Sequence, residues 1–302
     1  MSHYTLDILG RRLTAIDASE NLVRWLEEHW NFPEHAGQLE SDWTFVLEYS
    51  ENPEPKGVRE GAKPLEGSIS PLKVAWTEDG SVWLLELAGG VRLVLEAEHH
   101  TVRLNWFGTL EYADALYQGL CEAMRSSGLI PLHASVAARD GKATAFLGPS
   151  GTGKTTTLLR AIAAGWQPVS EDFSWLEPET LTLFSWDRKL HLLPDTLERL
   201  EEMFPGVRPL EFNGRKHTVA FEHLGERLWH CPLESLTVLE RDSTQTSSWT
   251  SLTLISGLVG LYASSGVPML KNQRQPFANM SNNILNRLQL RKLLLGQSIP
   301  PL

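Results

Sequence analysis

Apolar and polar residues alternate along the first third of the chain with the two-residue period of β-strands. The clearest run covers residues 43–49, Trp-Thr-Phe-Val-Leu-Glu-Tyr. Further short runs occupy residues 73–76, 81–87, 91–95 and 101–106. Glu78-Asp79-Gly80 and Gly89-Gly90 separate some of these runs and are typical turn formers. Residues 1–108 are therefore predicted to form a smaller β-rich domain, with one helix over 18–29 and an exposed loop over 50–68.

Helical and mixed patterns follow this region. Residues 112–125 are predicted to form a helix within a segment, 109–130, that bridges two domains. From 131 to 302 strands and helices alternate, which predicts an α/β domain. Residues 249–270 carry no charge, but they hold six Ser or Thr, three Gly and Pro268. A buried helix ending near Gly266 is therefore expected there, and not a membrane span.

Charge and cysteine content narrow the function classes. The 302 residues include 27 basic and 37 acidic side chains, a net charge of −10, which disfavours a general nucleic-acid binder. Cys121 and Cys231 lie far apart and are expected to be reduced structural thiols. The N-terminus shows no secretory signal pattern. We expect a cytoplasmic protein without a membrane segment, and the oligomeric state stays open, a homo-oligomer included.

The strongest chemical motif lies at residues 148–155, Gly-Pro-Ser-Gly-Thr-Gly-Lys-Thr, between an apolar strand and a helical pattern. It matches the phosphate-binding loop G-x-x-x-x-G-K-[ST]. In such a loop backbone N–H groups surround the phosphates, the lysine reaches the β- and γ-phosphates, and the hydroxyl ligates Mg²⁺. The sequence therefore predicts an ATP and Mg²⁺ site. Its expected residues are Gly148, Ser150, Gly151, Thr152, Gly153, Lys154, Thr155 and Thr156.

A β-hairpin precedes this loop. Asp140-Gly141 is a typical two-residue turn between apolar runs. With that turn, Arg139 pairs with Lys142, and continuing the pairing places His133 opposite Gly148. His133 is then either a functional imidazole beside the phosphates or a strand-start histidine bonded to backbone.

Two acidic candidates follow the loop. Glu171-Asp172 comes after a short strand, where phosphoryl transfer needs a carboxylate to hold Mg²⁺ or to accept a proton. A solvated turn is the alternative. Leu236 to Glu240 competes, because it is a more apolar strand ending in an acid, whereas Pro168 weakens the first strand as a central one.

These residues carry a resemblance. Pro-Leu-His133-Ala-Ser, the hairpin, the phosphate loop and Ser-Glu171-Asp172 are similar to the kinase domain of HPr kinase/phosphorylase and its relatives. The resemblance covers about residues 128–302, with its specific part at 131–175. It implies a fold akin to phosphoenolpyruvate carboxykinase and a serine hydroxyl as acceptor. It also implies that His133 lies beside the catalytic acid, that Lys154 binds phosphate and that Thr155 binds Mg²⁺, which leaves Glu240 structural.

The chain also departs from that family. The first acid is Glu171 where the family has aspartate, and no segment matches the one linked to phosphorolysis, so a kinase without phosphorylase activity is expected. The N-terminal half looks more like stand-alone relatives found with ribosomal-peptide biosynthesis, including lasso-peptide kinases. Of the acid pair, the longer Glu171 is the expected base, and Asp172 is expected on the metal side with Thr155.

The predicted function is ATP- and Mg²⁺-dependent transfer of phosphate to a serine of a peptide or small protein. Two alternatives stay open: an ATPase or nucleotide-gated binding module, and a small-molecule kinase. In the basic turn at residues 213–217, Arg215 or Lys216 could contact phosphate or an acidic substrate, or the turn could be a solvated hairpin tip. Arg188, Lys189 and His191 form a weaker candidate of the same kind.

Overall fold

The computed structural model describes residues 3–51, 56–65, 71–87, 89–110, 113–242 and 246–296. Its contacts divide the chain into two compact units, which are described separately. Unit 1 comprises Met1–Gly128 with Pro268–Pro276, and unit 2 comprises Leu129–Val267 with Phe277–Leu302.

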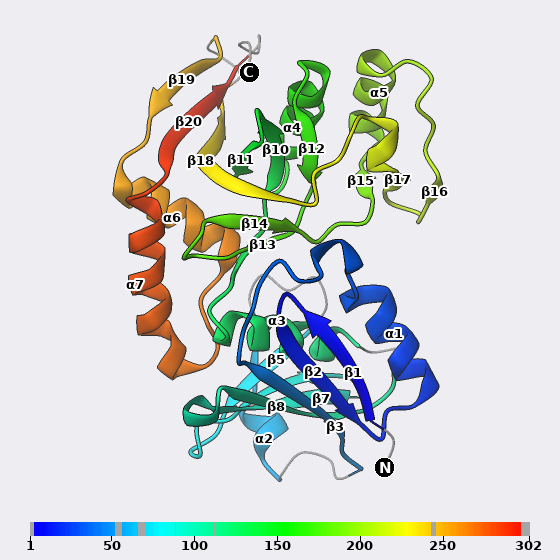
Figure 1. Cartoon of the computed structure of the whole chain (residues 1–302), viewed down its shortest axis with the longest axis vertical. Helices are drawn as coiled ribbons and strands as arrows, with labels where there is room; N and C mark the ends of the chain where they lie inside the picture. The colour runs from blue at the N-terminus through cyan, green and yellow to red at the C-terminus, as the bar shows by residue number, and fades with distance from the viewer. Residues whose placement is uncertain are drawn as a thin grey trace. The chain divides into compact units, whose positions relative to one another are not determined.

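Unit 1 is built on one eight-stranded sheet with the strand order β1-β2-β3-β8-β7-β6-β5-β4 (Figure 1). The strands are β1 (His3–Ile8), β2 (Arg11–Ile16), β3 (Thr44–Tyr49), β4 (Lys63–Pro64), β5 (Lys73–Trp76), β6 (Val82–Glu86), β7 (Gly89–Glu96) and β8 (Thr101–Phe107). The β-rich prediction is confirmed. The turn prediction at Gly89-Gly90 is wrong, because both glycines begin β7 and pair with Glu86 and Leu85.

The helices of unit 1 are α1 (Glu20–Trp30), the short α2 (Val58–Gly61) and α3 (Asp114–Ser126). Thus α2 and β4 occupy part of the predicted loop 50–68, and its residues 52–55 and 66–68 lie outside the described residues. Helix α3 packs on β6, β7 and β8. A side chain at Gly119 would stand 2.8 Å from Val91 Cγ1, so the helix lies close to the sheet. The predicted bridging helix is therefore an integral part of unit 1.

Unit 2 centres on a mixed nine-stranded sheet that runs β12-β10-β11-β18-β14-β13-β9, with β20 beside β18 and β19 beside β20. Its strands are β9 (Ile130–Leu132), β10 (Ser135–Arg139), β11 (Lys142–Leu147), β12 (Gln167–Ser170), β13 (Ser174–Leu176), β14 (Thr182–Ser185), β18 (His230–Arg241), β19 (Ser248–Ser251) and β20 (Gln289–Leu295). A small sheet of β15 (Leu190–Leu192), β17 (His217–Val219) and β16 (Glu211–Phe212) completes the unit. Strand β12 is at a sheet edge, where Pro168 is tolerated.

Helices cover both faces of the nine-stranded sheet. The helices are α4 (Lys154–Ala163), α5 (Pro194–Met203), α6 (Leu254–Ser265) and α7 (Arg274–Leu285). Because side chains alternate along a strand, β11 sends Phe146 toward the core that contains α4, while Ala145 and Leu147 face the core of α6 and α7. The described residues thus form a mixed α/β protein, and the finer kinase-type fold assignment stays a prediction.

The hairpin before the phosphate loop forms as predicted. Arg139 pairs with Lys142, and Asp140 and Gly141 both have positive φ, 53° and 73°. The ladder ends at Ser135 opposite Phe146, however, so it does not extend to His133. The predicted pairing of His133 with Gly148 is wrong, because the chain leaves the sheet there: the N–H of His133 bonds the carbonyl of Ser264.

Helix α6 ends at Gly266, as predicted. It is not the buried helix expected from its apolar sequence, because Ile255 and Val259 keep 76% and 65% of their surface exposed. Within the described ranges, the helices are too short or too polar to cross a lipid bilayer.

Candidate active site

The phosphate loop joins β11 to α4 and has the open backbone that phosphate binding requires. Gly153, immediately before the helix, has φ 104°, a left-handed conformation that glycine adopts without strain. At Gly148 a Cβ atom would stand 2.7 Å from Thr152 Oγ1. The loop therefore needs glycine at both positions, and it ends at the N-terminus of α4, where backbone N–H groups favour an anion.

The Lys154 side chain lies folded into the loop. It is buried, and its Nζ donates to the carbonyls of Gly148 at 2.8 Å and Pro149 at 3.4 Å. Burial lowers the pKa of Lys154, while the charges of Asp172 and Glu171 oppose that shift. The ammonium group thus lies inside the loop, where the motif expects the lysine that reaches the β- and γ-phosphates.

Glu171 is enclosed beside the first turn of α4. The Thr155 hydroxyl donates to Glu171 Oε1 at 2.6 Å, and the backbone N–H of His191 donates to Oε2 at 3.4 Å. Only 3% of Glu171 is exposed. Burial, reinforced by the charges of Asp187 and Asp172, raises its pKa to about 7. This carboxylate therefore lies against the hydroxyl that the motif assigns to Mg²⁺.

Asp172 points to a different partner. Its Oδ1 lies 2.8 Å from His133 Nε2, and the two side chains are 44% and 50% exposed. Burial alone would raise the pKa of Asp172, but the hydrogen bond and charge of His133, with Lys216 and Lys154, bring it below its ordinary value. Asp172 is therefore ionised at neutral pH and accessible, and His133 orients it.

Asp187 holds the turn that carries both acids, and no motif in the sequence had identified it. Its Oδ2 accepts hydrogen bonds from the Ser170 hydroxyl and from the backbone N–H groups of Glu171, Asp172 and Phe173. Burial raises its pKa, while these donors lower it. The only sequence signal was an acid directly after the apolar run 183–186, Leu-Phe-Ser-Trp.

Some of the candidate substrate residues lie near the acid pair Glu171 and Asp172, and others do not contact it. Lys216 interacts electrostatically with Lys154, Glu171 and Asp172, so the tip of the β16–β17 turn lies near the acid pair. The Asn213 side chain holds this turn by accepting the N–H groups of Arg215 and Lys216. Within the described part of the chain, no contact joins the exposed Arg215 side chain to Glu171 or Asp172. Of the weaker set, His191 reaches Glu171 through its backbone N–H.

Glu240, the competing acid, ends a strand beside the loop strand. Strands β11 and β18 are parallel, with Leu147 opposite Val238. The Glu240 carboxylate pairs with Lys292 Nζ at 2.5 Å. It therefore lies beside the loop but already has a positive partner.

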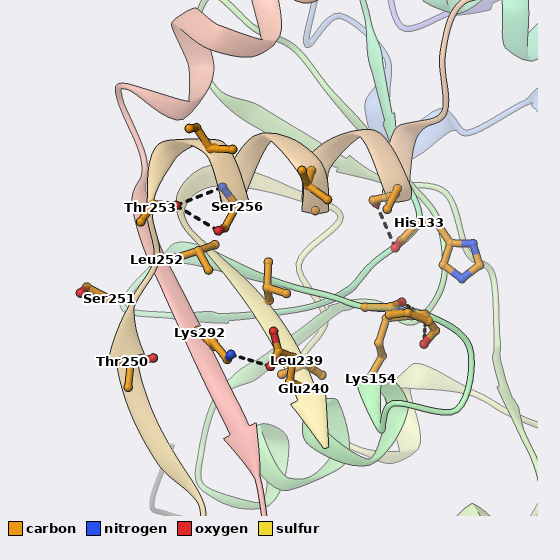
Figure 2. Close-up of a pocket in the computed structure, with 18 of the residues that line it drawn as sticks. His133, Lys154, Leu239, Glu240, Thr250, Ser251, Leu252, Thr253, Ser256 and Lys292 are labelled. Atoms are coloured by element: carbon orange, nitrogen blue, oxygen red, sulfur yellow. Dashed lines mark hydrogen bonds and ion pairs between the residues drawn. The ribbon is translucent and has the colours of Figure 1, made fainter. Parts of the chain in front are cut away.

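A cavity of about 910 Å³ opens from the loop. His133 and Lys154 line one end, and α6 forms a wall (Figure 2). Thr250 to Thr253 line the other end, and Glu240 and Lys292 lie between the two ends. This volume is within the range of about 300 to 1,000 Å³ usual for ligand sites.

The high pKa of Glu171 makes stability depend on pH. Its folded pKa of about 7 exceeds the ordinary value of 4.5, so the folded state holds the extra proton between these values, and stability falls as pH rises through this window. The full cost, about 3 kcal/mol, applies above pH 7. We expect Glu171→Gln to stabilise the nucleotide-free protein by up to that amount at pH 8 and little at pH 4.5, in urea unfolding followed by tryptophan fluorescence. An equal effect at both pH values would contradict this origin.

The residues present fit a nucleotide-bound Mg²⁺. Among the described residues, no group of three or more His, Cys, Asp and Glu side chains could hold a metal. Mg²⁺ usually takes one or two carboxylates, with substrate phosphates and water completing its shell. Thr155 and Glu171 supply a hydroxyl and a carboxylate for that arrangement.

Comparison with known proteins adds no assignment. No protein-family model matches the chain, and no curated protein matches it.

Proposed function

We propose that this protein is a kinase that transfers the γ-phosphate of ATP, with Mg²⁺, to a serine hydroxyl of a peptide or small protein. One observation carries the proposal: next to a phosphate loop, two adjacent carboxylates contact different partners, Glu171 the Thr155 hydroxyl and Asp172 the His133 imidazole. Transfer to a hydroxyl needs a metal ligand and a proton acceptor, and this arrangement offers both.

From side-chain length, Glu171 was expected to be the base and Asp172 to bind the metal. The contacts favour the opposite assignment. Glu171 has a pKa near that of an ideal base, but it is 3% exposed and both its oxygens are engaged, one of them by Thr155, so it is less accessible to an acceptor than Asp172. Geometry takes precedence over pKa in choosing a base. We therefore assign Glu171 to the metal side with Thr155, and the accessible Asp172 to the acceptor.

The proposed step transfers the γ-phosphate from ATP to the acceptor hydroxyl. The acceptor oxygen bonds to the γ-phosphorus, the bond from that phosphorus to the ADP oxygen breaks, and Asp172 takes the hydroxyl proton. Mg²⁺, when bound, offsets the charge on the phosphates. Lys154 holds the phosphate end, and His133 keeps the Asp172 carboxylate oriented. Lys216 adds positive charge near the same site.

The serine acceptor comes from the resemblance to HPr kinase/phosphorylase relatives. The motif residues supporting that resemblance lie together here: His133 against Asp172, and Thr155 against Glu171. Kinase activity without phosphorylase activity is part of the proposal.

Transfer is tested by incubating the protein with labelled ATP, Mg²⁺ and serine-containing peptides, and locating phosphate by mass spectrometry. We expect phosphoserine from the wild type.

Lys154→Ala should bind ATP about 10- to 100-fold more weakly in calorimetric titration, because it removes a charge-assisted contact worth about 1.5 to 3 kcal/mol. Unchanged affinity would mean that nucleotide binds elsewhere, and wild-type ATP binding without any transfer would favour a binding module.

A second candidate is an ordinary phosphate-loop ATPase. The observation that favours it is the position of Glu240 at the end of β18, parallel to and beside the loop strand β11. In such enzymes an acid at this position binds Mg²⁺. The ion pair between Glu240 and Lys292 argues for the kinase assignment, because it leaves Glu240 less available for a metal.

A further inference from the structure

The cavity along α6 begins where an acceptor must bind. Ser150 and Lys154 of the loop line it together with His133, which holds the proposed base Asp172. A loop lysine marks the β/γ end of the nucleotide. The cavity therefore continues from the γ-phosphate end of the site, on the side from which a hydroxyl would approach.

On the side of the loop that faces away from the cavity, Arg241 and Leu295 contact the loop. Arg241 Nε donates to the carbonyl of Thr152 at 3.2 Å, and Leu295 Cδ1 would lie 3.2 Å from a Cβ at Gly153. None of these residues lines the cavity. Arg241 and Leu295 thus cover this flank of the loop, whereas the cavity opens from the flank that carries Gly148, Pro149 and Ser150.

The wall of the cavity is an apolar helix face that remains exposed. Ile255 and Val259 line the cavity with 76% and 65% of their surface exposed. Leu254, on the same helix, is 41% exposed and does not line it. The floor is formed by Val238 and Leu239 of β18. Apolar surface of this kind gains free energy when an apolar group covers it, about 25 cal/mol per Å².

The cavity has a defined start and length. The C-terminal turn of α6 is bound to the acceptor end, because Ser264 Oγ donates to the carbonyl of His133 at 3.1 Å and the N–H of His133 bonds Ser264 O. Helix α6 has 12 residues, about 18 Å at 1.5 Å per residue. An extended peptide rises about 3.3 Å per residue, so about five residues cover that distance.

We infer that the cavity along α6 binds the acceptor as an extended peptide, with the serine at His133 and an apolar side chain against Ile255 and Val259. The far end offers the hydroxyl groups of Thr250 and Ser251 for the peptide backbone. This inference rests on the proposed kinase function. It adds a substrate class: peptides with an apolar residue within about five positions of the serine.

The test is a specificity reversal in a peptide library. Each peptide has one fixed serine and randomised flanking positions, and phosphorylated products are sequenced. We expect the wild type to prefer Leu, Ile, Val or Phe over Lys and Arg about tenfold at one or more flanking positions. The double variant Ile255→Asp, Val259→Asp should reverse this preference toward Lys and Arg, because it replaces the apolar wall with negative charge.

Matched controls separate the alternatives. Leu254→Asp, on the same helix but outside the cavity, should keep the wild-type preference, and all variants should keep ATP affinity within about threefold. If the double variant keeps the wild-type preference for apolar residues, the inference is wrong but the proposed kinase function is unaffected. A large loss of ATP affinity in that variant would overturn it too, by assigning the cavity to the nucleoside. Tight ATP binding with no phosphorylated peptide from the wild type would overturn the proposed function and the inference together.

Discussion

Replacing Asp172 with asparagine should lower the rate of phosphoryl transfer by about 10²-fold or more, while ATP and Mg²⁺ still bind with nearly wild-type affinity. The amide keeps the shape of the side chain but cannot accept the hydroxyl proton. His133→Ala should cost less, because His133 acts through Asp172, to which it bonds at 2.8 Å. Single-turnover rates at saturating ATP and Mg²⁺ measure both effects.

Two other carboxylates supply the controls for this experiment. Glu171→Gln should raise the Mg²⁺ concentration needed for half-maximal rate, because Glu171 lies against Thr155. Glu240→Gln should leave activity nearly intact, since Glu240 is paired with Lys292. If Glu240 proves essential while Glu171 and Asp172 are dispensable, the protein is a phosphate-loop ATPase of the ordinary kind.

Replacing Asp187 with alanine should destabilise the protein by about 3 kcal/mol or more, because a buried donor left without its acceptor costs about 1 to 3 kcal/mol. The Asp187 carboxylate accepts the backbone N–H groups of Glu171, Asp172 and Phe173. Its loss should also lower the transfer rate by up to about 10²-fold, since the turn that places both acids would shift. Urea unfolding and single-turnover kinetics measure the two effects.

Asp187→Asn keeps one carbonyl oxygen and should lose less stability than Asp187→Ala. Asp195→Ala is a matched control: this exposed aspartate in the first turn of α5 should cost less than about 1 kcal/mol. Equal losses for Asp187→Ala and Asp195→Ala would show that the Asp187 hydrogen bonds do not stabilise the turn.

The sequence by itself determined the features that depend on local backbone chemistry. The phosphate loop followed from glycine spacing, the hairpin from Asp140-Gly141, and the end of α6 from Gly266. A short segment contains all the atoms that decide such features. One wrong prediction also concerns local backbone chemistry: Gly89-Gly90 resembled a turn in composition but starts β7, because pairing with β6 decides its position.

Only the tertiary structure decided which acid has which neighbour. Residues adjacent in sequence point in different directions, but the pattern Ser-Glu-Asp contains nothing to say that α4 lies beside Glu171 and His133 beside Asp172. The same holds for Asp187, which is 15 residues from Asp172 and reaches it through the fold. The cavity likewise depends on the packing of α6 on β18. Long-range contacts of this kind decide which apolar faces are buried and which stay exposed.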